Sequence, residues 1–437
     1  LTDPAGARLL PPGFPALVVA DPRRVLGALS AQIYAHPAER MRTIGVTGTQ
    51  GKTTTTRLLL AALEAMGHRV GAIGTVGTRI AGRDVASGLT TPEAPDLQAL
   101  MAVMVEAGVT DCVMEVSSHA LVKGRVDGVR FDVAGFANLG RDHLDFHESV
   151  EDYFAAKATL FTPERARAGV VNADDIYGQR LVRQAGIPLR TMSLPTPDDQ
   201  STSADWWLSA VDLGPMGSRA LVHGPGLPSE GVRLELSMPG DFNLANALLA
   251  IACGAEAGHD PAELVAAMAR AKGVPGRLER VEAGQDFVVL VDYAHKPDAV
   301  EATLLTLRPL TRGRLILVLG AGGDRDSGKR PVMGRIAGEL ADLVVITDDN
   351  PRSEEPAAIR AAVLAGVVGP GEAVEIGDRR AAIRYAVTQA QADDVVVIAG
   401  KGHESGQDVG GVITPFDDRL VAAEELGARA RNPSGAP

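Results

Sequence analysis

The sequence predicts an α/β protein built on two mostly parallel sheets. Short apolar runs of strand length alternate with helical patterns from Thr43 onward. Such alternation is typical of parallel sheets covered by helices on both faces. The 437 residues are too many for one ordinary core, and Pro and Gly interrupt the pattern at residues 274–277. We therefore expect two α/β domains joined near this segment.

The first series of elements begins after a short N-terminal segment. That segment predicts a strand at residues 16–19 and a helix at 25–34. The predicted strands of the series are 44–46, 111–116, 133–136 and 169–171, and its helices include 53–66 and 94–106. Residues 187–240 are rich in Ser, Pro and Gly and predict an antiparallel appendage, followed by a helix at 243–257.

The second series predicts a doubly wound (Rossmann-like) domain. Its predicted strands are 287–291, 315–319, 343–346 and 395–398, and its helices include 297–307 and 357–365. Parallel sheets bind ligands in loops at the carboxyl ends of their strands. We therefore expect one active site shared between the two domains, with a hinge near Arg277.

Charge and composition narrow the class of partner. The 43 basic and 55 acidic residues give a net charge of −12, which disfavours nucleic acid as a partner but permits small anions bound by local clusters. No apolar run is long enough to cross a bilayer, and residues 1–20 do not resemble a signal peptide. Cys112 and Cys253 lie in apolar segments and are expected to be buried free thiols. We expect a monomeric cytoplasmic protein, without membrane insertion, that binds small molecules.

Residues 44–53 combine a strand, a Gly-rich turn and the start of a helix. Backbone N–H groups at Gly48 and Gly51 suit phosphate oxygens, Lys52 adds a positive charge, and the Thr53 hydroxyl suits Mg²⁺. This combination predicts a nucleotide loop on a P-loop-type sheet. The alternative is a tight turn that carries a surface lysine.

Three further residues are candidates for the active site, although the sequence pattern around each of them is less specific. Glu115 ends a predicted strand, where a carboxylate holds the nucleotide's Mg²⁺ or is simply solvated. His143 follows another strand, and a loop histidine is by itself more often structural. Lys157 reads, on its own, as an ordinary helix-surface lysine.

Four strings together resemble the Mur ligases: GTQGKTT at 48–54, MEVSSHAL at 114–121, NLGRDHLDFH at 138–147 and YFAAKATLF at 153–161. The usual Asn of the family's nucleotide loop is Gln50 here. The resemblance implies an ATP-dependent ligase whose catalytic residues are Lys52, Glu115, His143 and Lys157. It further implies that Glu115 and His143 hold a second Mg²⁺, and that CO₂ converts Lys157 to a carbamate, the oxygen ligand that Mg²⁺ prefers.

The resemblance also implies the substrate contacts. It assigns ATP to Gly48, Thr49, Gln50, Gly51, Lys52, Thr53, Thr54, Asn246, Arg277, Asp292 and His295. It assigns a UDP-muramoyl dipeptide to Thr90, Thr91, Ser117, Lys123 and Arg125. By the same resemblance, residues 1–41 are the end of a uridine-nucleotide-binding domain, 42–277 the ATP-binding ligase domain and 278–437 the amino-acid-binding domain.

Residues 349–352 spell DNPR, which resembles the family's signature for addition of meso-diaminopimelate. The guanidinium of Arg352 can donate two parallel hydrogen bonds to the distal carboxylate of diaminopimelate. If lysine were the substrate, its ammonium would face the guanidinium, and this contact between like charges would weaken binding. The resemblance adds Arg325, Asp349, Asn350, Pro351, Gly400 and Glu404 to this amino-acid subsite.

Several alternatives stay open at this point. The first is a lysine-adding ligase of the same family. More distant ones are a folylpolyglutamate synthetase and a P-loop ATPase that performs no ligation. Arg352 itself has a plainer interpretation, in which it caps a turn or pairs with Glu354 or Glu355.

Overall fold

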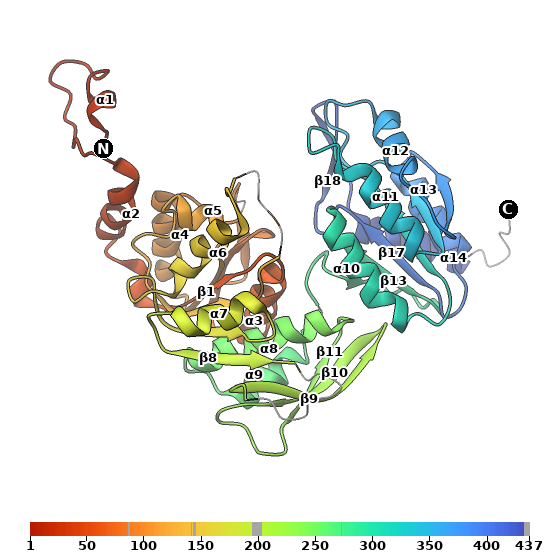
Figure 1. Cartoon of the computed structure of the whole chain (residues 1–437), viewed down its shortest axis with the longest axis horizontal. Coiled ribbons are helices and arrows are strands. Elements are labelled where there is room, and N and C mark those ends of the chain that lie inside the picture. Colours follow the sequence, from red (N-terminus) through yellow and green to blue (C-terminus); the bar gives the residue numbers. More distant parts are fainter. Residues whose placement is uncertain (86–87, 141, 143–145, 195–202, 272, 432–437) are drawn as a thin grey trace. The chain divides into compact units, whose positions relative to one another are not determined.

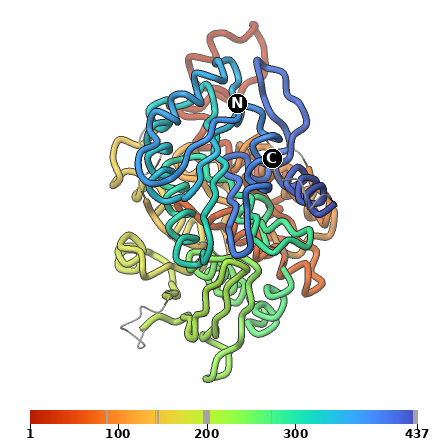
Figure 2. Tube along the Cα trace, turned by 90° about the vertical axis from the view of Figure 1, so that its right-hand side faces the viewer, coloured from red at the N-terminus to blue at the C-terminus, as the bar shows by residue number. Residues whose placement is uncertain are grey.

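The computed structural model describes residues 1–437 except 86–87, 141, 143–145, 195–202, 272 and 432–437. The chain forms two compact units. The first comprises Leu1–Val211, Ala220–Glu235 and Phe242–Ala271, and the second comprises Asp212–Arg219, Leu236–Asp241 and Lys272–Pro437. The course of the chain within each unit can be followed in Figures 1 and 2.

The described part of the first sheet is 11-stranded, in the order β11-β10-β9-β8-β7-β6-β1-β5-β2-β3-β4. Strands β5, β1, β6 and β7 run parallel at its centre, which confirms the predicted parallel sheet. The bounds are β1 Arg42–Thr47, β2 Val70–Gly74, β3 Gly77–Ile80, β4 Arg83–Val85, β5 Asp111–Glu115, β6 Phe131–Phe136, β7 Ala166–Asn172, β8 Leu189–Ser193, β9 Trp206–Gly214, β10 Gly217–His223 and β11 Val232–Leu236.

The prediction of an antiparallel appendage at residues 187–240 is wrong for its first two strands. Strand β8 pairs parallel with β7, and β9 pairs parallel with β8 through Met192 and Trp206. The helix α7 (Ile176–Gln184) supplies the crossover that a parallel β7–β8 pair requires. The chain reverses direction at the two-residue link between the neighbouring strands β9 and β10. Composition marked the turns of this segment but carried no signal for strand direction.

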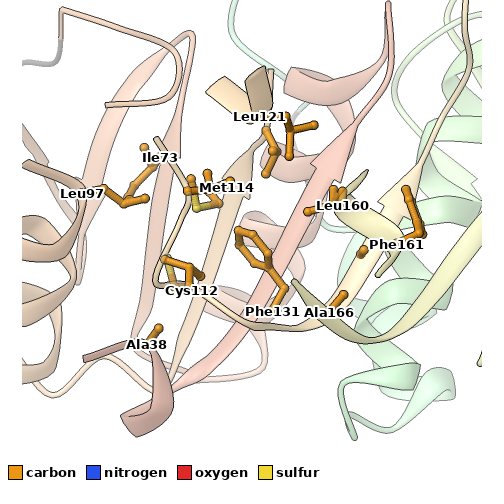
Figure 3. Packing of buried hydrophobic residues seen from close by; sticks show 14 of the residues in the cluster. Ala38, Ile73, Leu97, Cys112, Met114, Leu121, Phe131, Leu160, Phe161 and Ala166 are labelled. Carbon is orange, nitrogen blue, oxygen red and sulfur yellow. The ribbon is translucent and has the colours of Figure 1, made fainter. Parts of the chain in front are cut away.

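Helices cover both faces of the first sheet. One core contains Leu97 of α4 with Cys112 and Met114 of β5 and Phe131 of β6 (Figure 3). Burying each of the Leu, Met and Phe side chains stabilises the fold by about 1.5–3 kcal/mol. The helices are α1 Pro4–Ala7, α2 Pro22–Ile33, α3 Lys52–Ala65, α4 Ala94–Glu106, α5 Ser118–Val122, α6 Val150–Ala158, α7, α8 Asp241–Glu256 and α9 Pro261–Met268, with 3₁₀ turns η1 Pro37–Arg40 and η2 Thr159–Phe161.

Two smaller sequence predictions have different outcomes. The strand predicted at residues 16–19 is wrong, because Val18 makes only an isolated bridge with Thr2 and has no ladder to join. The two cysteines are buried and free, as predicted, and burial raises the pKa of the Cys112 thiol to about 12. Among the described helices, none combines the length and apolar character needed to cross a membrane.

Strand register brings the candidate residues of the first unit to one edge of its sheet. Val46 lies beside Glu115 on β5, and Thr47 lies beside Phe136 on β6. The strands are parallel, so the loops that follow them leave the sheet at the same edge. The Gly-rich turn, the segment after Glu115 and the segment after Phe136 are therefore neighbours.

The second unit is a doubly wound domain, as predicted. Its sheet has the order β12-β13-β17-β14-β15-β16, and β13 to β16 are parallel. Residues of β13 alternate between two cores, with Val288 and Leu290 on one face and Val289 and Val291 on the other. Helices α10, α11 and α12 cover the first face, and α13 and α14 cover the second (Figure 1).

The elements of this unit match the predicted strands and helices within a few residues. Their bounds are β12 Glu279–Arg280, β13 Val288–Asp292, α10 Pro297–Leu307, η3 Arg308–Leu310, β14 Leu315–Leu319, α11 Lys329–Leu340, β15 Leu343–Ile346, α12 Pro356–Leu364, β16 Glu372–Glu375, α13 Arg379–Gln389, β17 Val395–Ala399, β18 Gly406–Val409, β19 Val412–Pro415 and α14 Asp418–Arg431. Strands β18 and β19 form a separate antiparallel hairpin.

Candidate functional site

The Gly-rich turn between β1 and α3 is shaped by close backbone approach. Gly51 has a φ of 83°, and a Cβ there would lie 2.3 Å from Asn246 Oδ1. Only glycine fits such a position. The Lys52 ammonium folds back over the turn and donates to the carbonyls of Gly48 at 2.7 Å and Thr49 at 3.0 Å. A glycine turn, a lysine and a helix N-terminus fit the phosphates of a nucleotide.

The rest of the turn is tied to the neighbouring loop. Thr49 Oγ1 accepts a hydrogen bond from Gly140 N at 2.9 Å, and Gln50 N donates to Asn138 Oδ1 at 2.9 Å. Thr54 is buried in the first turn of α3. Asn246, from α8, lies beside the turn with Oδ1 3.4 Å from Thr55 Oγ1. The loop is therefore ordered by side chains from two other segments.

A buried carboxylate lies directly beside the nucleotide loop. Thr53 Oγ1 donates to both oxygens of Glu115, each at 3.0 Å, and Glu115 is only 1% exposed. Thr75 donates to the same carboxylate from its N–H at 2.8 Å and its hydroxyl at 3.1 Å. A Cβ on Gly74 would lie 2.3 Å from Glu115 Oε1. This pair of hydroxyl and carboxylate oxygens is the donor set that Mg²⁺ prefers.

Thr75 was missed by the sequence reasoning. It follows β2 at the carboxyl end of a strand parallel to β5, so its position in the pattern was a usable signal.

Lys157 is buried, so its interpretation as a surface lysine is wrong. It is 1% exposed, and Nζ donates to Gly48 O at 2.9 Å and to Thr47 Oγ1 at 3.5 Å. Burial, and secondly the charge of Lys52, hold the pKa of Lys157 well below its ordinary value. Sequence alone gave no sign of this, since α6 is short and carries charged residues beside it. A lowered pKa increases the fraction of the amine that is unprotonated and therefore nucleophilic.

His143 lies outside the described residues. The neighbouring His147 is 2% exposed, with Nε2 3.0 Å from Ser118 Oγ and Nδ1 3.2 Å from Asp152 Oδ2. In the described part of the chain, no three His, Cys, Asp or Glu side chains form a preassembled metal site. The candidate metal ligands described are therefore Thr53, Glu115 and Lys157.

The predicted dipeptide residues fall into two groups. Thr90, Thr91 and Ser117 adjoin the Glu115 cluster: Thr90 Oγ1 lies 3.2 Å from Thr75 Oγ1, and Thr91 Oγ1 donates to Glu115 O at 2.8 Å. Ser117 Oγ lies 3.5 Å from Thr91 Oγ1. These hydroxyls form one polar surface at the edge of the sheet.

Lys123 and Arg125 form the second group, beyond the short helix α5. Arg125 Nε donates to Glu93 at 2.9 Å, and Arg125 Nη1 donates to Thr91 O at 3.4 Å. Lys123 Nζ lies 5.6 Å from the centre of the Phe146 ring. Arg125 is therefore linked to the first group through Thr91.

In the second unit, Asp292 organises the backbone at the end of β13. It is 8% exposed, and its carboxylate accepts hydrogen bonds from Leu278 N at 2.8 Å and Ala294 N at 3.0 Å. Burial raises the pKa of Asp292, while the charge of Arg277 opposes this. The Arg277 guanidinium lies 4.8 Å over the ring of Tyr293.

His295 is a neutral histidine of fixed orientation. Its Nδ1 lies 2.8 Å from Tyr293 O, and a carbonyl can only accept, so Nδ1 carries the proton. Burial is the largest of the causes that lower the pKa of His295 to about 4. Near neutral pH this side chain therefore offers an acceptor nitrogen, Nε2, and no positive charge.

The titration of His295 should appear in the acid stability of the protein. Its folded pKa of about 4 lies below the ordinary value of 6.5, so the unfolded chain binds more protons between these values. Stability present above pH 6.5 is thus lost as the pH falls through 4. We expect His295→Gln to lose less thermal stability than the wild type between pH 7.5 and 5, by calorimetry. His36→Gln, at an exposed histidine, is the control, and equal losses in all three proteins would contradict the assignment.

The DNPR segment follows β15 and is held by buried contacts. Asn350 is 7% exposed, and Arg352 has a φ of 53°, a left-handed conformation that is rare for arginine. Arg352 N donates to Asp408 O at 3.0 Å, and Nη1 donates to Gly323 O at 2.6 Å. Glu354 pairs with Arg330 at 2.8 Å. The alternative in which Glu354 neutralises Arg352 is therefore wrong.

The other predicted amino-acid residues lie around this segment. Asp349 Oδ2 is buried without a hydrogen-bond partner among the described residues, and a Cβ on Gly400 would lie 2.3 Å from it. Glu404 accepts from Asn350 Nδ2 at 2.8 Å. Pro351 is buried, whereas Arg325 is exposed and donates to Asp324 O at 3.2 Å. All but Arg325 therefore form one connected group.

Comparison with known proteins identifies the same two regions. Residues 46–254 match the Mur ligase middle domain, and residues 276–402 match the Mur ligase glutamate ligase domain. The chain is 52% identical, over 98% of its length and 84% of the relative's, to a UDP-N-acetylmuramoyl-L-alanyl-D-glutamate–2,6-diaminopimelate ligase of Streptomyces avermitilis. A Leifsonia xyli protein named UDP-N-acetylmuramyl-tripeptide synthetase is 44% identical, over 98% of this chain and 84% of its own length.

Solved structures agree with this comparison. A UDP-N-acetylmuramoyl-L-alanyl-D-glutamate–2,6-diaminopimelate ligase structure has a TM-score of 0.70 and 34% identity, covering 95% of this chain and 84% of that one. A Mycobacterium tuberculosis folylpolyglutamate synthase structure has a TM-score of 0.67 at 19% identity, over 94% of this chain and 95% of that one. The second likeness concerns the fold alone.

Proposed function

The chain belongs to the Mur ligase family, and from this premise we propose that it joins meso-diaminopimelate to UDP-N-acetylmuramoyl-L-alanyl-D-glutamate with hydrolysis of ATP. The observation that carries the choice of amino acid is Arg352. Its guanidinium belongs to a DNPR segment whose backbone is fixed by buried contacts. A fixed planar cation suits the distal carboxylate that distinguishes diaminopimelate from lysine.

Ligases of this family use ATP and Mg²⁺. In this chain, Gly48 to Thr54 would hold the phosphates, and Thr53 with Glu115 would hold the ion. The Mg²⁺ supplies charge neutralisation and orientation for the transferred phosphoryl group. Two observations support the binding of ATP and Mg²⁺ by these residues. The glycine turn has no room for a Cβ at Gly51, and the side-chain oxygens of Thr53 and Glu115 lie next to each other. Asn246, Arg277, Asp292 and His295 are proposed as further ATP contacts, and His143 as a further ligand.

We propose that Lys157 reacts with CO₂. The neutral Nζ forms a bond to the carbon of CO₂ and loses a proton, so that a buried amine becomes a two-oxygen carbamate. The lowered pKa of Lys157 supports this step, because the amine must be unprotonated to react. The product is an oxygen ligand of the type that Mg²⁺ binds. Its neighbour Lys52 would offset its negative charge.

The proposed reaction has two steps. The glutamate carboxylate of the dipeptide attacks the γ-phosphate of ATP and gives an acyl phosphate; the free amine of diaminopimelate then attacks that carbonyl, and phosphate leaves. The first step brings two anions together, so the ammonium of Lys52 has to neutralise charge as they meet. Thr90, Thr91, Ser117, Lys123 and Arg125 are proposed to orient the dipeptide, and the DNPR group with Arg325, Gly400 and Glu404 to orient the amine.

The domain roles follow the same proposal. Residues 1–41 would belong to a uridine-nucleotide-binding domain, 42–277 to the ATP-binding domain and 278–437 to the amino-acid-binding domain. We further propose a cytoplasmic monomer, since two buried free thiols and a need for ATP suit a reducing compartment.

Phosphate release with a panel of amino acids tests the function. With ATP, Mg²⁺ and the UDP-muramoyl dipeptide, we expect phosphate release to depend on meso-diaminopimelate and to exceed that with L-lysine by at least about 100-fold in kcat/KM. Release without any amino acid acceptor would indicate a non-ligating ATPase instead.

A lysine-adding ligase is the second candidate. It is kept because the name of the Leifsonia xyli relative does not specify the amino acid. The same panel separates the two, since a preference for lysine, or equal use of both amino acids, would contradict the role of Arg352.

A further inference from the structure

We propose that Lys401 is a positioning residue for the incoming amino acid, an inference that rests on the proposed function and deepens it. Lys401 follows β17, directly after Gly400, and its side chain is 0% exposed. Its ammonium donates to Gly406 O at 2.6 Å and to Asn350 Oδ1 at 3.0 Å, and it lies 3.3 Å from Glu404 Oε2. Two of these partners are side chains of the predicted amino-acid subsite.

The contacts of Lys401 match its hydrogen-bonding capacity. An ammonium has three N–H donors and no acceptor, and three acceptor oxygens surround it. Asn350 Oδ1 also accepts from Asp408 N at 3.0 Å, which fixes the side-chain amide with its oxygen toward Lys401. The Nδ2 of Asn350 is thereby directed to Glu404 Oε2, at 2.8 Å. The orientation of both subsite residues is thus set by one buried cation.

In this arrangement one carboxylate oxygen of Glu404 accepts hydrogen bonds from within the subsite, and the other is available to a ligand. Oε2 accepts from both Asn350 and Lys401, whereas Oε1 makes no hydrogen bond within the described residues. The Glu404 side chain is 33% exposed. Oε1 is therefore the atom that can receive an ammonium group of the amino acid, in a direction that Lys401 fixes.

Lys401 also acts on the segment that carries Arg352. The hairpin residue Asp408 bonds to Asn350 through its N–H and accepts from Arg352 N through its carbonyl. Gly406, at the start of the same hairpin, accepts from Lys401. The ammonium thus joins the DNPR segment, Glu404 and the hairpin into one rigid group.

Stability alone does not account for a lysine at this position. A fully buried cation loses its hydration, and apolar replacements of buried ion pairs are often neutral or stabilising. Methionine has a similar length and would fill the same space. A residue kept for packing would not need three directed hydrogen bonds to two subsite side chains and a hairpin carbonyl.

The test is Lys401→Met, assayed by phosphate release. We expect the KM for the amino acid to rise roughly tenfold or more, as expected when hydrogen bonds to a charged group are lost. The KM values for ATP and dipeptide should stay within about twofold and kcat should fall less than KM rises. The control is Arg314→Met. Arg314 pairs with Asp394 at 3.0 Å, and these two residues directly precede β14 and β17. This ion pair therefore lies at the end of the sheet opposite to Lys401, which follows β17.

A second readout does not depend on turnover. Amide hydrogen exchange at residues 350–352 and 406–409 should accelerate at least about tenfold in Lys401→Met and remain unchanged there in Arg314→Met. Unchanged exchange together with an unchanged KM for the amino acid, or equal rises in all three KM values, would overturn the role of Lys401. If the wild type uses an amino acid other than diaminopimelate, the proposed function fails, and Lys401 is judged by the KM for that amino acid and by exchange.

Discussion

Lys157→Met is expected to lose ligase activity and to gain thermal stability in the absence of ligands. Activity should fall by on the order of 10²–10³ or more, because the oxygen ligand proposed at this position is lost. Stability should rise by on the order of 1 kcal/mol, because a buried amine of strongly lowered pKa is replaced by an apolar side chain. Phosphate release and differential scanning calorimetry measure the two effects.

The pH dependence of that stability gain has a definite sign. With its folded pKa well below the ordinary 10.5, Lys157 binds fewer protons in the folded than in the unfolded chain between those values. Uncarboxylated wild type therefore gains stability from this group as the pH rises through that window. The Met variant lacks this slope, so its advantage should be larger at low pH.

Lys157→Arg is the matched control. It keeps a cation, cannot form the carbamate and cannot become neutral, so it should be inactive and less stable than the wild type. Acetate at high concentration should partly restore Lys157→Ala by supplying oxygen ligands. Full activity in Lys157→Met, or a loss of stability as large as that of the Arg variant, would contradict the assignment.

Arg352→Ala is expected to impair the use of diaminopimelate by roughly 2–5 kcal/mol in apparent binding, the cost of leaving a buried carboxylate unpaired. The KM for ATP should barely change, because the hydrogen bonds of Arg352 within the described residues join it to Gly323, Asp408 and Gly410, none of which is assigned to ATP. Steady-state kinetics with each substrate varied in turn gives both values.

Backbone conformation provides an internal control for this prediction. Arg352 has a φ of 53°, which glycine adopts without strain and alanine does not. Arg352→Gly should therefore lose diaminopimelate use as Arg352→Ala does, while being about 0.5–1 kcal/mol more stable than the Ala variant. Arg335→Ala, at an exposed arginine paired with Glu339, should change neither property. An unchanged KM for diaminopimelate in both Arg352 variants would refute the assignment.

The sequence by itself determined the fold class and the location of the nucleotide loop. Short apolar runs such as Leu315–Leu319 are typical of strands buried on both faces, and the glycines around Lys52 favour a tight turn before a helix. The edge of the sheet at which Glu115 lies followed from the parallel direction of β5 and β1. These features depend on local periodicity and on the alternation of strands with helices, which neighbouring residues encode.

Tertiary structure alone decided the burial of Lys157, the contacts of Lys401 and the parallel direction of β8 and β9. Lys157 and Lys401 carry no local signal, because a lysine in a helix or a loop is normally solvated. Lys157 is buried against Thr47 at the end of β1 and Gly48 in the turn that follows, about 110 residues away in the chain. Lys401 meets Asn350 only because β17 and β15 flank β14. Distant segments brought together by the sheet set the hydrogen bonds of both amines and lower the pKa of Lys157. No short window of sequence contains these contacts.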